Sequence, residues 1–306
     1  MTFDKHNWLQ LALKWQGSVL PTVLPRIFLC SGFAFFISLT HYYGFDLAEQ
    51  IFSSVTTNVA YNLVLGLLLV FRTNTAYDRY WEGRKIWGSI VINSLNLARK
   101  IKLAIAETET VDRENKIAVL RLLSAFAVAT KLHLREQSDP QELEAFLTQA
   151  QYLQLQEVKN IPLKISFWIG AYLKQQQVRN CLSIYELVPM NQALDAMVEA
   201  FIGCDCIKKT PIPLAYGIYL KRLLLIYCFV LPFQLVHDVS WWTIPIVTLI
   251  SFILLGIEEI GNQIENPFSN SANDLPIDEI CNTLVKNIED IIKAEDSPLN
   301  NEIKTL

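Results

Sequence analysis

The chain has 306 residues, of which 52% are hydrophobic and 18% are charged, with 11 glycines and 12 prolines, so a disordered, collagen-like or low-complexity protein is excluded. Its net charge of −4 offers no basic field for a phosphate backbone, which argues against nucleic acid as a partner. The mean hydropathy of +0.26 is high for a soluble protein, because the apolar residues are gathered into long spans.

Four apolar segments are candidates for transmembrane helices, because a bilayer core of about 30 Å needs about 20 residues of helix. The first hairpin, 27–71, follows an N-terminal segment, 1–26, and contains spans at 27–45 and 51–71. The second span is unusual, because it carries six Ser, Thr and Asn residues and then ends in a wholly apolar run.

The region between the hairpins, 72–213, has the composition of a soluble helical domain. Its apolar residues recur every three or four positions, for example over 116–136, which predicts about three to five amphipathic helices. We expect these helices to form a large domain on one side of the membrane.

A second hairpin occupies 214–257, with spans at 214–236 and 241–257 around the short turn HDVS. The C-terminal segment, 258–306, contains a linker rich in Asn and Ser and then a terminal helix at 278–293. The predicted fold is therefore all-α, a polytopic membrane protein with four transmembrane helices and a helical domain.

The basic residues predict the orientation, because Lys and Arg resist translocation. Eighteen of them lie between Arg72 and Lys209, whereas 27–71 and 223–285 contain none, so the hairpin tips should face outward. Both termini and the middle domain are then cytoplasmic. The cell membrane is the expected location, with the thylakoid membrane as the alternative.

Two neighbouring stripes of different chemistry follow the second span. Asn58 and Asn62 belong to a polar stripe, and Val59, Leu63 and Leu67 to an apolar one, each at a spacing of four residues. If several copies surround an axis, the amides would line the outer pore and the aliphatic stripe would form a narrow neck that gates by dewetting. Alternatively, the amides bond to neighbouring spans and the stripe packs against lipid or other helices.

Charged and aromatic residues follow this span directly, so the helix should continue into the cytoplasm. We interpret the charges over 72–85 as a salt-bridged girdle at the membrane interface. A catalytic carboxylate pair, Asp78 and Glu82, is the alternative, but it would need an acceptor or a metal that the sequence does not indicate.

Neither the cysteines nor the histidines form the pattern of a metal site. Cys204 and Cys206 are separated by one residue only, and the four histidines lie far apart. The sequence also contains no nucleophile elbow, phosphate loop or Rossmann glycine pattern. We therefore predict no catalytic residue, metal site or cofactor.

Three stretches identify a family resemblance. VLGLLLVFRTNTAYDRYWEGRKIWG at 64–88, TPIPLAYGIYLKRLLLIYCFVLPFQLV at 210–236 and IENPFSNSANDLP at 264–276 resemble the bacterial branch of the bestrophin family. The opening NWLQLALKWQGSVLP is most similar to cyanobacterial members. The resemblance implies a homopentameric ion channel in the bilayer, in which five second spans line a central pore.

The resemblance also implies specific site residues. The family's neck of three apolar rings aligns with Val59, Leu63 and Leu67, an aliphatic set where the family commonly has Ile and Phe. A second, cytosolic constriction falls within 182–188, and we assign it to Ile184; the alternative is that Ile184 is an ordinary packing residue.

Animal members of the family carry a calcium clasp after the fourth span. The matching positions here are Gln263, Asn266, Ser271 and Asp274, so at least one acidic ligand of the clasp is missing. A hard cation prefers about six to eight oxygens with carboxylates among them, so we assign no metal here.

The sequence thus favours a passive channel for chloride or a similar small monovalent anion, because the second span carries no Asp or Glu. A monovalent cation channel of the same architecture is the alternative, and a membrane-embedded enzyme or scaffold is a further one.

Overall fold

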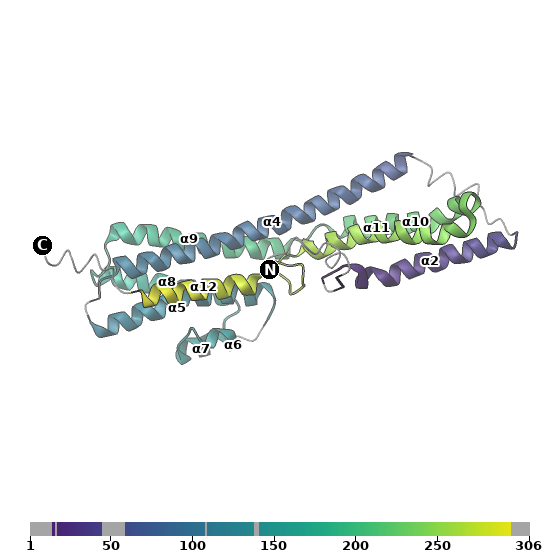
Figure 1. The fold of residues 1–306 in the computed structure, drawn as a ribbon. Helices are drawn as coiled ribbons and strands as arrows, with labels where there is room; N and C mark the ends of the chain where they lie inside the picture. Colours follow the sequence, from purple (N-terminus) through teal and green to yellow (C-terminus); the bar gives the residue numbers. More distant parts are fainter. Residues whose placement is uncertain (1–13, 16, 45–58, 108, 138–140, 295–306) are drawn as a thin grey trace. The chain divides into compact units, whose positions relative to one another are not determined.

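The computed structural model describes residues 14–15, 17–44, 59–107, 109–137 and 141–294, and these form helices and their connections without a strand (Figure 1). The chain divides into two compact units. The first unit comprises 1–80, 211–267 and 271–274, and the second comprises 81–210, 268–270 and 275–306. Helix α4, Val59–Ala104, contributes its first half to one unit and its second half to the other.

In the first unit, three apolar helices pack on one another. They are α2, Leu20–Tyr42; α10, Leu214–Val239; and α11, Thr243–Glu265. Two buried residues of α4, Leu65 and Leu69, join the core that these helices share.

The turn between α10 and α11 differs from the expected HDVS turn. Helix α10 continues to Val239, and the chain reverses at Ser240, which has a positive φ of +50° and begins the 3-10 helix η1, Ser240–Trp242. Helix α11 is also longer than the predicted fourth span, because it runs eight residues past 257 to Glu265.

The second unit is a helical bundle built around α5, Thr110–Leu134. Helices α8, Ile161–Val178, α9, Ile184–Lys209, and α12, Ile277–Lys293, pack against it. Two short helices, α6, Gln141–Glu144, and α7, Gln149–Leu155, lie between α5 and α8 in sequence.

Polar caps define where these helices begin. Ser183 accepts a hydrogen bond from the backbone of Glu186 at the start of α9, and Asn160 accepts one from Leu163 at the start of α8. The terminal helix α12 buries Ile277, Cys281 and other residues on one face, as expected for an amphipathic helix.

Three helical stretches within the described residues are long and apolar enough to cross a membrane: Leu20–Tyr42, Thr110–Leu134 and Leu214–Glu265. The third contains both α10 and α11, which correspond to the second predicted hairpin. The predicted span 51–71 is not among the three, and its first part, 51–58, lies outside the described residues. The count of four spans therefore stays a prediction.

Candidate functional site

Helix α4 presents two opposite faces in the first unit. Leu65 and Leu69 are buried in one cluster with Val23 and Ile27 of α2, Leu220 and Leu224 of α10, and Leu255 of α11. Tyr61 and Tyr216 add polar contacts, since the Tyr61 hydroxyl donates to the carbonyl of Leu223 and the Tyr216 hydroxyl to that of Leu68. One face of α4 is thus fixed to the other helices of its unit.

The apolar stripe singled out from the sequence lies on the other face. The side chains of Val59, Leu63 and Leu67 are 79%, 68% and 49% exposed. Asn62 is also exposed, whereas Asn58 lies outside the described residues. The aliphatic stripe is therefore available to something other than its own chain.

A buried cation anchors the end of this apolar segment. Arg72 is 4% exposed, and its Nη2 donates to Glu265 Oε2 at 2.5 Å and to Asn262 Oδ1 at 3.0 Å. Glu265 Oε1 accepts from the backbone of Ile212 at 2.8 Å, and the Glu265 carbonyl accepts from Arg79 Nε at 3.2 Å. One carboxylate thus ties α4, α11 and the start of α10 together.

Glu265 is not among the site residues that the sequence predicts. Arg72 and Arg79 belong to the predicted interfacial girdle, yet both side chains bond to α11 rather than only to neighbours on α4. An isolated arginine at the end of a long apolar run needs a partner, because a buried charge is costly without one. Only three acidic residues occur in α11, so this requirement could have suggested Glu265.

Two further carboxylates of α11 lie outside the sites predicted from the sequence. Glu258 and Glu259 are buried, and Arg26 Nη1 lies 3.6 Å from the Oε2 of Glu258 and 3.2 Å from that of Glu259. Lys221 Nζ of α10 lies 3.7 Å from Glu258 Oε1. The predicted fourth span ended at Ile257, directly before these charges, and the helix continues through them.

The residues that match the calcium clasp lie at the end of α11 and in the connection between α11 and α12. Asn273 Nδ2 donates to Gln263 Oε1 at 2.8 Å and to the carbonyl of Gly17 at 3.2 Å. The backbone of Ser271 donates to Asp274 Oδ2 at 2.5 Å. Protein donors thus occupy an oxygen of Gln263 and one of Asp274, and Asn273 joins this connection to the segment before α2.

In the second unit, Ile184 is the first residue of α9 and is exposed. Its position follows from the Ser183 cap, which fixes the start of the helix. The described part of its own chain leaves 60% of Ile184 exposed.

Ion pairs in the second unit lower the pKa of two carboxyl groups. Burial raises the pKa of Asp278, but hydrogen bonds from Arg135 at 2.8 Å and Lys131 at 3.1 Å outweigh burial and leave its pKa below the ordinary value. Burial acts in the same way on Asp205, and hydrogen bonds from Lys209 and His133 again lower its pKa overall. Both groups are therefore ionised at neutral pH.

Comparisons with known proteins agree over almost the whole chain. The sequence profile of bacterial/fungal bestrophin proteins matches residues 1–290. A voltage-dependent anion channel-forming protein of Nostoc sp. is 49% identical over 291 residues, which cover 95% of this chain and 94% of that protein. A protein with the same description from Synechocystis sp. is 46% identical over 300 residues, which cover 96% of each chain.

Solved structures show the same fold. A crystal structure of a bacterial bestrophin homologue from Klebsiella pneumoniae matches with a TM-score of 0.79 at 25% identity, covering 90% of this chain and 100% of that one. A variant of the same homologue matches with a TM-score of 0.80 at 27% identity, covering 92% and 100%.

Proposed function

The chain belongs to the bacterial/fungal bestrophin family, and we propose that it forms a passive channel for chloride or a similar small monovalent anion. The family and the apolar helices make it an integral membrane protein. The relatives described as anion channel-forming proteins support the anion assignment. A channel, rather than an enzyme, is the activity that this family membership indicates.

The exposed stripe of Val59, Leu63 and Leu67 is the observation that carries the proposal. Large aliphatic side chains left in water cost about 25 cal/mol for each Å² of apolar surface, so the stripe needs a partner or a role. The opposite face of α4 already packs on its own unit. Five copies that turn these residues to a common axis would form an apolar neck, where water is held weakly and ions are stopped by dewetting.

The charges on α4 favour anions over cations. No Asp or Glu occurs between Val59 and Tyr77, so the outer wall would consist of aliphatic groups and the amides of Asn58 and Asn62. The one charged side chain of that segment, Arg72, is buried and paired with Glu265. A neutral, amide-lined vestibule can replace part of an anion's hydration shell, whereas a cation pore usually carries a ring of acids.

Further features belong to the same proposal. The exposed Ile184 would form a second constriction on the cytosolic side. Four spans in each subunit follow the four apolar segments of the sequence, and both termini in the cytoplasm follow the distribution of Lys and Arg. The cell membrane is the proposed location.

The direct test is the reversal potential of the purified protein in a planar bilayer with asymmetric potassium chloride. We expect it to move toward the chloride equilibrium potential. Movement toward the potassium value would replace the anion channel by the cation channel of the same architecture.

The neck has its own test. Replacing Val59, Leu63 and Leu67 together by Ala should raise the conductance and weaken closure, because a wider neck holds water. Val64→Ala is the matched control, since Val64 is 52% exposed but lies about 100° around the helix from Leu63. Equal currents in the triple variant and the wild type would remove these residues from the gate.

The oligomeric state separates the channel from an enzyme or scaffold. Native mass spectrometry should give five times the chain mass of 35.0 kDa, together with bound lipid or detergent. A monomer or dimer would leave the stripe without an axis and would exclude the neck.

A further inference from the structure

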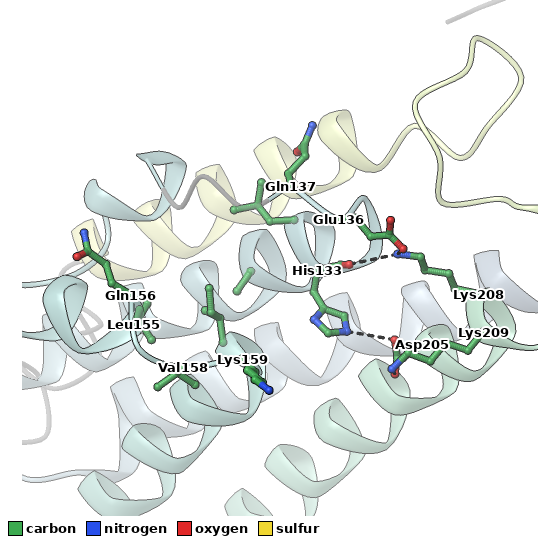
Figure 2. Close-up of a pocket in the computed structure, with 13 residues that line it drawn as sticks. His133, Glu136, Gln137, Leu155, Gln156, Val158, Lys159, Asp205, Lys208 and Lys209 are labelled. Atoms are coloured by element: carbon green, nitrogen blue, oxygen red, sulfur yellow. Dashed lines mark hydrogen bonds and ion pairs between the residues drawn. The ribbon is translucent and has the colours of Figure 1, made fainter.

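A cavity of about 670 Å³ lies within the second unit (Figure 2). Its walls come from the end of α5, the segment that joins α7 to α8, and the end of α9. This volume falls within the range of about 300–1,000 Å³ typical of small-molecule sites. The cavity is formed by one unit alone and involves none of the residues assigned to the neck or to the cytosolic constriction.

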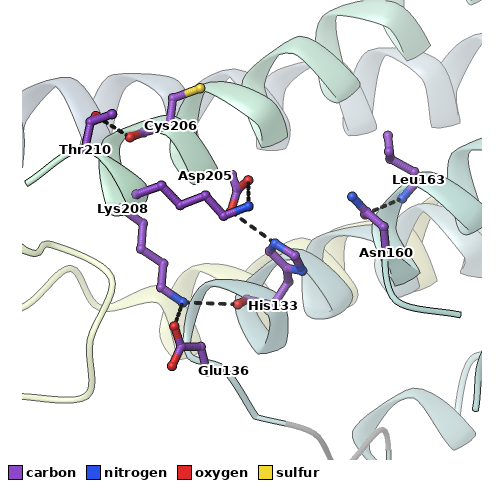
Figure 3. A network of polar contacts seen from close by, with 9 residues as sticks. His133, Glu136, Asn160, Leu163, Asp205, Cys206, Lys208 and Thr210 are labelled. Carbon is purple, nitrogen blue, oxygen red and sulfur yellow. Dashed lines mark hydrogen bonds and ion pairs between the residues drawn. The ribbon is translucent and has the colours of Figure 1, made fainter.

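Positively charged side chains outnumber negatively charged ones around the cavity. Lysines at 159, 208 and 209 stand against two carboxylates, those of Glu136 and Asp205. Lys208 Nζ lies 2.9 Å from Glu136 Oε1 (Figure 3). Lys209 Nζ lies 2.6 Å from Asp205 Oδ2, so both carboxylates already have a lysine partner. Lys159 has no ion-pair partner among the described residues, which leaves one positive charge at the cavity.

His133 adds a second polar group to the same wall. Its Nε2 lies 3.1 Å from Asp205 Oδ1, and its ring packs edge-on against Phe201 at 5.2 Å between centroids. The other ring nitrogen, Nδ1, therefore lies on the side of the ring away from Asp205 (Figure 2). Because Asp205 is ionised, its Oδ1 accepts a hydrogen bond from Nε2–H of His133. A proton on Nδ1 would add a second donor, at the cavity.

The remaining wall is apolar. Leu132 of α5 and Leu155, Val158 and Ile161 of the opposite wall line the cavity beside the charged groups. A ligand that fits both surfaces needs one negative group and a short hydrocarbon body. Surface lysines alone would favour any anion, but the aliphatic wall favours an anion with methylene groups to bury.

We propose that this cavity binds a small organic carboxylate, with its carboxylate between Lys159 and His133 and its aliphatic body against Leu132, Leu155 and Val158. The single unpaired charge of Lys159 matches the single charge of such a ligand. Other charged groups facing His133 are Asp205, Lys208 and Lys209 of α9 and Glu136, which follows the end of α5. Each of these is already paired with another member of the set.

The test uses the full-length protein in detergent, with chloride constant, and isothermal titration calorimetry with sodium butyrate. We expect butyrate to bind about tenfold more tightly than acetate, because each buried methylene contributes about 0.8 kcal/mol. Butylammonium, which has the same body and the opposite charge, should not bind. Absence of butyrate binding, or equal binding of butylammonium, would overturn the proposal.

Lys159→Gln should weaken butyrate binding about five- to tenfold, in line with the loss of one charge-assisted contact. Lys159 is exposed, so this variant should fold normally. Lys174→Gln is the matched control, because Lys174 is an exposed lysine of α8 that bonds to Gln177 and does not line the cavity. An equal affinity of butyrate for the wild type and Lys159→Gln would place its binding elsewhere, for example in the pore.

His133 is tested by its own NMR signals. In the wild type, NMR of histidine-labelled protein should show the His133 ring resonances shifting when butyrate is saturating. His133→Ala should weaken butyrate binding about fivefold, because one contact of the carboxylate is lost. Wild-type His133 resonances that butyrate leaves unchanged would exclude His133 from the site, whether or not the variant folds.

Discussion

Helices α2 and α5 are both long and apolar enough to cross a membrane, yet the chain buries them to different extents. Of the most apolar 18 residues of each helix, the chain itself buries 78% in α5 and 33% in α2. The charged residues at either end of α5 have partners, since Asp112 pairs with Arg179 and Lys131 with Glu142. Hydropathy therefore identifies an apolar helix but not what covers it.

Helix α2 shows the other case. It buries Val23, Ile27 and Cys30 against its own unit, while Phe28 and Leu29 between them are exposed. A helix that is apolar on all sides and covered on one side only needs lipid or a second chain on the other. The bundle around α5 supplies its own cover, and the first unit relies on its surroundings and on a few buried polar contacts.

The first test of this difference between the units removes the buried cation of the first unit, Arg72. Arg72→Met leaves Glu265 without its ion-pair partner, and loss of one member of a buried pair costs about 3–5 kcal/mol. The midpoint of thermal unfolding in detergent, followed by circular dichroism, should fall sharply.

Two matched variants sharpen that result. Arg222→Met changes an exposed arginine of α10 in the same unit and should lower the midpoint much less. Adding Glu265→Gln to Arg72→Met should restore part of the loss, because the unpaired carboxylate is then neutral. If Arg72→Met unfolds no earlier than Arg222→Met, the first unit does not depend on this contact.

A second variant pair compares buried and exposed leucines. Leu284→Ala on α12 opens a cavity in the second unit and should cost about 2–4 kcal/mol. Leu29→Ala on α2 makes the same change at an exposed position and should stay within about 0.5 kcal/mol. Chemical denaturation in detergent measures both, with Asn282→Ala, on the exposed face of α12, as a control. Similar losses of unfolding free energy in Leu284→Ala and Leu29→Ala would contradict the conclusion that the second unit buries its apolar residues while α2 leaves some of them exposed.

The sequence was sufficient for the parts of the fold that depend on periodicity. It predicted the continuation of the second span into a long helix, the terminal helix, and the helical character of 72–213, because each depends on local spacing. It could not give the partner of Arg72. That contact joins residues 193 positions apart, and no local pattern encodes which acid of α11 reaches α4. The positions of Val59, Leu63 and Leu67 on one face were predictable from spacing, while their role stays a prediction.

The third test uses pH. The pKa of Asp278 is lowered in the folded state, so its pairs with Arg135 and Lys131 add stability above the ordinary pKa of 3.8 and lose it as the pH falls below that value. The side chain is half exposed, so solvent screening limits the loss to about 1 kcal/mol. The unfolding midpoint should fall between about pH 7 and pH 3 by less in Asp278→Asn than in the wild type. Equal falls would assign the acid sensitivity to other groups, such as Asp205.

The smallest expected effect belongs to the exposed pair that joins α5 and α12. Arg121 Nε lies 3.0 Å from Glu289 Oε1, and both side chains are partly in water. A double-mutant cycle of Arg121→Gln and Glu289→Gln should give a coupling of about 0.2–1 kcal/mol, because solvent and salt screen such pairs. The coupling should shrink further as salt is added. A coupling as large as the loss in Leu284→Ala would mean that ion pairs, rather than the apolar face of α12, hold this helix to the second unit.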